Sequence, residues 1–252
     1  MNRTAIVTGA GSVRGIGRAT AHHLAAAGWH VAVLDLDPGD TAAEVADRHG
    51  YATLGLACDV TSRDAVDAAV AEVEATLPPV GGLVNNAGVT SPIPFLEVTD
   101  EEWERVFAVN VRGSYTVTRR VAPGMAERGF GRIVFLSSVS AERGGGVFGG
   151  VAYSAAKAGL LGFARALARE LGPRGVTANA VAPGLVDTDI TGGAITGERL
   201  EAMLAGIPTG RLGSVEDVAN LVTFLCREQS ATSPGPPTTS TAGRTSTEVL
   251  RP

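Results

Sequence analysis

Short apolar runs alternate with helical patterns along most of the chain. Ala5–Thr8 is apolar and is followed by a cluster of glycines. A helical pattern then extends from about Ile16 to Ala27, and Gly28 ends it. The same order of strand, loop and helix recurs, and it predicts strands at Ala5–Thr8, His30–Leu34, Thr53–Ala57, Leu83–Val84, Ile133–Leu136 and Val176–Val181.

Helices are predicted between these strands. Two of them begin with capping-box patterns, in which Thr99 pairs with Glu102 and Ser214 pairs with Asp217. Helices are expected at residues 16–27, 41–49 and 62–77, from Thr99 onward, and at residues 152–171 and 214–226. This alternation predicts a single α/β domain with a Rossmann-like fold: a doubly wound parallel sheet of six or seven strands, covered by helices on both faces in three layers.

Composition narrows the function classes. The net charge of −5 implies no basic face, so nucleic acid is not expected as a partner. No apolar run reaches about 18 residues, and the first strand begins almost at once, so we expect neither a membrane span nor a signal peptide. Two cysteines do not make a disulfide framework and favour a cytoplasmic location. The four histidines show no ligand spacing with the cysteines, so no metal site is expected.

The glycine cluster after the first strand is typical of a phosphate-binding loop. Gly9, Gly11, Gly15 and Gly17 lie between a strand and the start of a helix, where backbone N–H groups and the helix dipole attract a pyrophosphate. Asp35 ends the second strand, 18 residues after Gly17, which is close to the usual offset of the acid that binds an adenosine ribose. Together they predict a dinucleotide site.

Several separate motifs resemble the classical short-chain dehydrogenase/reductase family. The resemblance covers roughly residues 3–229, and its closest branch is the 3-oxoacyl-thioester reductases, through Gly210-Arg211-Leu212-Gly213 and Asn179-Ala180-Val181-Ala182-Pro183-Gly184. The other motifs, in the family's order, are Thr8-Gly9…Gly15-Ile16-Gly17, Asp59-Val60, Asn85-Asn86-Ala87-Gly88, Asn110, Ser138, Tyr153-Ser154-Ala155-Ala156-Lys157, and Pro183-Gly184 with Thr188.

Two loops depart from the family pattern. The glycine loop has five residues between Gly9 and Gly15 where the family usually has three, which leaves open which N–H groups bind phosphate. The stretch from Ser138 to Tyr153 is about two residues longer than usual, and its glycines, Gly144-Gly145-Gly146, suggest a flexible loop beside the substrate.

The resemblance implies an enzyme that moves a hydride between nicotinamide and a carbonyl or secondary alcohol. Tyr153 would donate or accept the proton, Ser138 would polarise the carbonyl oxygen, and Asn110 would hold a water that relays protons from Lys157. A free Tyr has a pKa near 10, and Lys157, one helical turn away, is expected to lower it. Lys157 is the only lysine in the chain, which suggests that this position requires a compact ammonium group.

The same resemblance gives the expected cofactor-binding residues. They are Gly9, Gly11, Ser12, Arg14, Gly15, Ile16, Gly17, Asp35, Leu36, Asp59, Val60, Asn86, Ala87, Gly88, Tyr153, Lys157, Pro183, Gly184, Val186 and Thr188.

Two of these residues favour different cofactors. Asp35 would accept hydrogen bonds from a ribose diol and repel a 2′-phosphate, whereas Arg14 stands where NADP-preferring relatives often carry a base. We favour NAD, because the strand places Asp35 directly at the ribose, and NADP stays open. Asn86 is expected to stabilise the sheet and the adenine pocket rather than to take part in chemistry.

The substrate is less defined. The segment Thr188–Pro208 is expected to form a lid, and its apolar residues, Ile190, Ile195, Leu200, Met203 and Leu204, either favour a moderately apolar small molecule or pack the lid on the core. A sugar, polyol or other secondary-alcohol dehydrogenase stays open, as do an epimerase or dehydratase on the same scaffold and a non-catalytic nucleotide sensor. The family also implies a homotetramer or homodimer, with the helices from Thr99 and from Ala152 forming one interface.

The C-terminal segment differs in composition from the rest. Residues 1–229 form the predicted catalytic domain, and 16 of the 23 residues from Ser230 to Pro252 are Ser, Thr, Pro or Gly, which predicts an irregular tail. Codons can be chosen for the stretch after Ala231 whose shifted reading gives Tyr-Ile-Thr-Gly-Ala-Thr-Tyr-Asp-Val-Asp-Gly-Gly, a strand of the type that relatives carry there. We hypothesise a frameshift near Ala231; the alternative is a natural disordered extension.

Overall fold

The computed structural model describes residues 2–145, 149–189, 197, 201 and 204–230. In this part of the chain six strands form one parallel sheet in the order β3-β2-β1-β4-β5-β6. The doubly wound sheet of the sequence prediction is therefore confirmed, with six strands. They are β1 (Thr4–Thr8), β2 (His30–Asp35), β3 (Thr53–Ala57), β4 (Val80–Asn85), β5 (Gly131–Leu136) and β6 (Val176–Val181).

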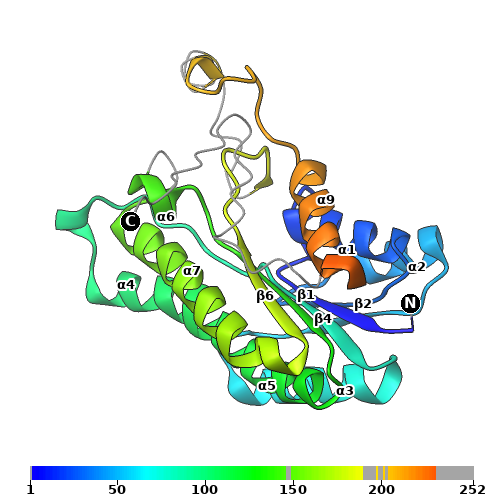
Figure 1. Cartoon of the computed structure of the whole chain (residues 1–252). Helices are drawn as coiled ribbons and strands as arrows, with labels where there is room; N and C mark the ends of the chain where they lie inside the picture. The colour runs from blue at the N-terminus through cyan, green and yellow to red at the C-terminus, as the bar shows by residue number, and fades with distance from the viewer. Residues whose placement is uncertain (1, 146–148, 190–196, 198–200, 202–203, 231–252) are drawn as a thin grey trace, which may run out of the picture.

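Helices cover both faces of this sheet, as Figure 1 shows. Successive strand residues point to opposite faces, so Ile6 packs with α3, α5 and α7, whereas Val7 packs with α1, α2 and α9. Both faces of the central strands are buried, which explains their continuous apolar sequences. The helices are α1 (Ile16–Ala26), α2 (Thr41–His49), α3 (Arg63–Thr76), α4 (Asp100–Phe107), α5 (Ser114–Glu127), α6 (Ser140–Arg143), α7 (Val151–Leu171) and α9 (Val215–Cys226).

The two predicted capping boxes form to different extents. The Ser214 side chain accepts a hydrogen bond from the Asp217 N–H, and the Asp217 carboxylate accepts one from the Ser214 N–H, so this box is complete. Thr99 likewise accepts from the Glu102 N–H, but the Glu102 carboxylate binds the Arg105 guanidinium instead of returning to Thr99. Only half of the second box is therefore present, because an arginine one turn away competes for the carboxylate.

The long helix predicted from Thr99 onward extends to Glu127, but it is not α-helical throughout. A π-helical segment, Ala108–Gly113, joins α4 to α5. At its centre, the Asn110 side-chain amide donates to the Val106 carbonyl oxygen at 2.9 Å, which competes with the usual backbone bond of that turn. Asn110 is thereby buried and fixed beside the loop that follows β4.

The strand order creates a crevice at the carboxyl ends of β1 and β4. The chain runs from β1 outward to β2 and β3, and then crosses back to β4 on the other side of β1. Ligands of open α/β sheets bind in the crevice at such a reversal of strand order. The glycine loop after β1 and the Asn86-Ala87-Gly88 segment after β4 therefore meet at one place.

Some of the predictions concern residues that the structure does not describe. They are those for the tail at 231–252, for Gly146, and for the lid residues Ile190, Ile195, Leu200 and Met203. No helix within the described ranges is both long enough and apolar enough to cross a bilayer.

Candidate active site

The glycine loop is held very close to the segment that follows β4. Gly9 has a φ of +67°, and a Cβ there would lie 2.6 Å from the Cα atom of Ala87. A Cβ on Gly17 would lie 2.4 Å from the Gly9 carbonyl oxygen, so the first turn of α1 can approach the loop only without a side chain. Asn86 then joins the two segments, because its amide donates to the carbonyl oxygens of Thr8 and Gly9. This is the stabilising role predicted for Asn86.

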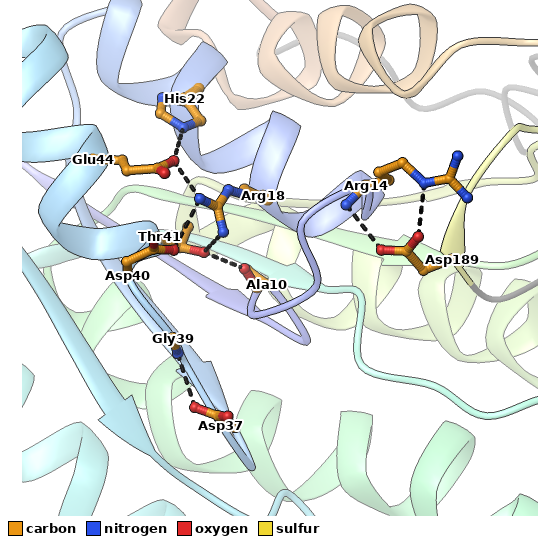
Figure 2. A network of polar contacts seen from close by, with 10 residues as sticks. All are labelled: Ala10, Arg14, Arg18, His22, Asp37, Gly39, Asp40, Thr41, Glu44 and Asp189. Carbon is orange, nitrogen blue, oxygen red and sulfur yellow. Dashed lines mark hydrogen bonds and ion pairs between the residues drawn. The ribbon is translucent and has the colours of Figure 1, made fainter. Parts of the chain in front are cut away.

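The loop is also supported from behind by a buried arginine. Arg18 on α1 donates to the Thr41 hydroxyl and forms ion pairs with Asp40 and Glu44, and the Thr41 hydroxyl donates to the Ala10 carbonyl oxygen at 2.9 Å (Figure 2). The conformation of the loop is therefore tied to α1 and α2 through side chains that lie outside the crevice.

The additional residues of the loop are placed by two carboxylates. The Gly11 N–H donates to Asp35 Oδ2 at 2.8 Å, which joins the loop to the end of β2. The Arg14 N–H donates to Asp189 Oδ2 at 3.0 Å, and the Arg14 guanidinium binds the same carboxylate (Figure 2). Both N–H groups are thus bound to side chains in this structure. At the start of α1, Gly15 provides no capping side chain, so the first-turn N–H groups receive no cap from it.

These elements enclose a cleft of about 450 Å³. Glycines that admit no Cβ form one side, and the helix start favours an anion, so the lining fits a dinucleotide. The lining residues are Gly9, Ser12, Gly15, Ile16, Leu34, Asp35, Leu36, Cys58, Asp59, Val60, Asn86, Ala87, Gly88, Val89, Val109, Thr188 and Asp189.

Twelve of the residues predicted for the cofactor site line this cleft, and eight do not. Gly11 and Gly17 support its wall from behind, and Arg14 points to Asp189. Pro183 accepts a backbone hydrogen bond from Val139, and Val186 is buried in the core, where it bridges to Gly213. The other three outside the cleft lining are Gly184, Tyr153 and Lys157.

The cleft also includes five residues that the sequence did not single out. Cys58 precedes Asp59, Leu34 precedes Asp35, Val89 follows Gly88 and Val109 precedes Asn110, so each is adjacent to a predicted residue. Asp189 follows Thr188, and no local pattern distinguishes it. The five are Leu34, Cys58, Val89, Val109 and Asp189.

The predicted catalytic side chains meet at the carboxyl end of β5. Ser138 follows that strand, and Tyr153 and Lys157 share one face of α7. The Ser138 hydroxyl is near enough to the Tyr153 phenol to lower its pKa, and the Lys157 Nζ lies 5.7 Å from the centre of the Tyr153 ring. Lys157 donates to the Leu136 carbonyl oxygen at 2.7 Å, and its own carbonyl oxygen accepts from the Ser137 hydroxyl.

The pKa of Tyr153 differs from the expectation. Burial raises the pKa of Tyr153, and the hydrogen bond from Ser138 lowers it, so the expected lowering by Lys157 is not found. The reason is geometric, because the ammonium group is directed to the Leu136 carbonyl oxygen. Burial also lowers the pKa of Lys157 to about 8.

Asn110 completes the group from the π-helical segment. Its amide nitrogen donates to the carbonyl oxygens of Val89 and Val106, while its Oδ1 atom is buried and finds no partner among the described residues. A Cβ added to Gly88 would lie 2.7 Å from Asn110 Oδ1 and 3.2 Å from Lys157 Nζ. The amide oxygen and the ammonium group therefore face the same small space at Gly88, which fits the predicted water between them.

Metal chemistry finds no support in this region. Within the described ranges, no three His, Cys, Asp or Glu side chains form a cluster that could hold a metal ion. Both cysteines are buried and free, and burial raises the pKa of the Cys58 thiol to about 11. The groups that meet beside Tyr153 are hydroxyl, ammonium and amide groups.

The chain is similar to known proteins along most of its length. A family model described as enoyl-(acyl carrier protein) reductase matches residues 9–243. A Sinorhizobium fredii protein described as a short-chain type dehydrogenase/reductase is 46% identical over 233 residues, which cover 91% of this chain and 92% of the relative. A 3-oxoacyl-(acyl carrier protein) reductase from Aquifex aeolicus is 41% identical, with 90% of each chain covered.

A solved structure is also similar. It is described as a putative NAD(P) dependent gluconate 5-dehydrogenase from Beutenbergia cavernae with bound NADP. The TM-score is 0.86 at 36% identity, with 96% of this chain and 95% of the other covered.

Proposed function

Because this chain belongs to the classical short-chain dehydrogenase/reductase family and is an NAD(P)-dependent oxidoreductase, we propose that it uses NADH to reduce the ketone of a 3-oxoacyl thioester. The observation that carries the chemistry is the buried ammonium group of Lys157 5.7 Å from the centre of the Tyr153 ring, with Ser138 on the phenol. The nicotinamide cofactor, when bound, supplies or accepts the hydride.

In this proposal each side chain has one task. The Ser138 hydroxyl donates a hydrogen bond to the ketone oxygen, and the Tyr153 phenol gives its proton to the alkoxide that forms. The high pKa of Tyr153 keeps the phenol protonated, as the reduction requires. Lys157 and Asn110 hold the water that returns a proton, and Lys157 also binds the nicotinamide ribose.

The acyl-thioester substrate is supported by the Aquifex aeolicus relative, and a polyol or sugar alcohol is supported by the Beutenbergia cavernae structure. A screen that follows NADH and NADPH oxidation with 3-oxoacyl thioesters, simple ketones and keto-sugars tests the choice. Turnover of 3-oxoacyl thioesters well above the others supports the proposal, and preferred turnover of a keto-sugar would replace it with the polyol alternative. Cofactor binding without turnover of any of them would favour a nucleotide sensor.

The preference for NADH is assigned to Asp35. Its carboxylate lines the cleft at the end of β2, whereas Arg14 is not among the residues that line the cleft. A carboxylate at this position repels the additional phosphate of NADPH. NADP stays the alternative, since the Beutenbergia cavernae protein is described with NADP bound.

Asp35→Ala is expected to raise the ratio of kcat/KM for NADPH over NADH by about tenfold, because about 1.4 kcal/mol of repulsion at a solvated site is removed. The measurement is steady-state kinetics with both cofactors. Asp37→Ala is the matched control, since it removes the same charge two residues away, outside the cleft lining. A wild type that prefers NADPH, together with an unchanged ratio in the variant, would contradict the assignment.

The proposal includes a homo-oligomer that forms through the outer faces of α4, α5 and α7. An apolar groove lies there, with the aromatic rings of Phe107, Tyr115 and Phe163 in its wall. Tyr115 is 44% exposed in the single chain, as expected of a ring that a second subunit covers in the oligomer.

Tyr115→Glu is therefore expected to shift the particle measured by light scattering to the mass of one subunit, because the interface would have to bury a carboxylate. Phe224→Glu is the control, since Phe224 is also exposed, at 51%, but lies on α9 at the opposite face of the sheet. A wild type that is already a stable, active monomer would refute the oligomer.

Two further assignments complete the proposal. The division into a catalytic domain at residues 1–229 and a tail at residues 230–252 is retained, together with the frameshift hypothesis for the tail. Resequencing the gene tests that hypothesis. The cytoplasmic location is retained on the strength of the two free cysteines.

A further inference from the structure

The Asp189 carboxylate accepts hydrogen bonds from polar groups of the glycine loop. Asp189 accepts hydrogen bonds from the Ser12 hydroxyl at 2.7 Å, from the Arg14 N–H at 3.0 Å and from Arg14 Nε at 2.8 Å. Figure 2 shows the Arg14 side chain turned toward this carboxylate. The pKa of Asp189 is lowered to about 2 by these bonds, so the group is an anion at every working pH.

The contact joins two distant parts of the chain at the mouth of the cleft. Ser12 and Asp189 are separated by 177 positions, and both line the cleft together with Gly15 and Ile16 at the start of α1. A diphosphate drawn to the start of that helix would lie in the same cleft as the Asp189 carboxylate. Two anions cannot share such a place without repulsion.

The donors that hold Asp189 are the donors that a phosphate uses. A hydroxyl, a backbone N–H and a guanidinium N–H directed to one oxyanion form a binding set for either a carboxylate or a phosphate. The Asp189 side chain is 43% exposed, so solvent can replace its contacts at modest cost.

We propose that the Asp189 carboxylate occupies a diphosphate-binding position of the free protein, and that the cofactor displaces it and takes over the Ser12 and Arg14 donors. The inference rests on the proposed function, since it needs the cleft to bind the dinucleotide. Asp189 is then an internal competitor that lowers cofactor affinity.

The test compares two neighbouring carboxylates. Asp189→Ala removes the competitor, and Asp187→Ala removes the same charge from an exposed side chain that does not line the cleft. Calorimetry measures the affinities of wild type and both variants for ADP-ribose, which carries the diphosphate, and for adenosine, which does not.

Asp189→Ala is expected to bind ADP-ribose about five- to tenfold more tightly than wild type, with adenosine unchanged. Asp187→Ala is expected to change neither affinity by more than about twofold. Equal gains in the two variants, or a gain for adenosine as well, would overturn the inference, because a general charge effect would then explain it.

The remaining outcomes separate this inference from the proposed function. If wild type binds ADP-ribose and Asp189→Ala binds it equally or less tightly, the carboxylate is neutral or helps to hold the cofactor, and only this inference falls. If wild type binds neither ADP-ribose nor NADH, the assignment of the cleft falls, and this inference falls with it.

Discussion

Tyr153→Phe is expected to lose at least about 100-fold in turnover while its affinity for the nicotinamide cofactor stays within about twofold of wild type. The phenol is the group proposed to give up a proton, and the Ser138 hydroxyl is near enough to lower its pKa. Phenylalanine retains the ring and its packing against Ala152 and Ala156 but removes the oxygen. The loss should therefore fall on kcat rather than on cofactor binding.

The measurement is steady-state turnover together with a fluorescence titration of NADH. Tyr51→Phe is the matched control, since Tyr51 lies against His30 at the far side of the sheet and loses the same oxygen. Turnover within a few-fold of wild type in Tyr153→Phe would mean that another group supplies the proton. A parallel loss in Tyr51→Phe would show that the effect is not specific to the site.

The pH profile adds an independent check on the same residue. Burial raises the pKa of Tyr153, so the protonated form persists into the alkaline range. Reduction is then expected to hold its rate across neutral pH and to decline only where Lys157, with a pKa of about 8, begins to lose its proton. A decline centred far below pH 8 would contradict these assignments.

The sheet could be predicted because local sequence determines it. β6 at Val176–Val181 is almost entirely buried and matches the predicted limits. β3 at Thr53–Ala57 also matches them, although it is an edge strand and only partly buried. The capping box at Ser214 could be predicted for a similar reason, since Ser214 and Asp217 lie within one helical turn.

The proposed catalytic pair could be identified in the sequence because Tyr153 and Lys157 are one helical turn apart and the lysine is unique. What the sequence could not supply was their electrostatics. The pKa of Tyr153 depends on how deeply the ring is buried, and the direction of the ammonium group depends on the Leu136 carbonyl oxygen of another element. Neither the depth of burial nor the direction of the ammonium group is encoded in the spacing of residues along one helix.

Contacts between loops that are distant in the sequence could not be predicted either. The position of Arg14 could be read in two ways until the structure placed it on Asp189, 175 positions away. The π-helical turn around Asn110 contains a side-chain bond to Val106 that helical periodicity does not reveal. Such features arise from the geometry of the assembled chain rather than from any local pattern.

Lys157→Met is expected to abolish most activity and at the same time to stabilise the protein. The ammonium group is buried, and among the described residues it forms no ion pair, so the fold carries an uncompensated charge. Burial lowers its pKa from 10.5 to about 8, which corresponds to roughly 3 kcal/mol against the charged form. The lost hydrogen bond to Leu136 offsets part of this, so a net gain of about 1–3 kcal/mol is expected at neutral pH.

The sign of the effect can be checked through pH. Between about pH 8 and 10.5 the unfolded chain holds the proton of Lys157 and the folded protein does not, so the stability of wild type rises with pH in that window. Methionine has no such proton. The advantage of Lys157→Met should therefore be complete below pH 8 and shrink toward pH 10.5.

Urea unfolding of wild type and Lys157→Met at pH 7 and pH 10 measures both effects, and turnover is measured in parallel. Arg165→Met is the control, because it removes one positive charge from an exposed position of the same helix and should change neither the stability nor the turnover.

Lys157→Arg retains the charge, yet it should also lose at least about 100-fold in turnover, because the larger guanidinium cannot replace a compact ammonium group beside Gly88. Full activity in Lys157→Arg would show that any buried cation suffices, and a less stable Lys157→Met would show that the bond to Leu136 outweighs the cost of burying the charge.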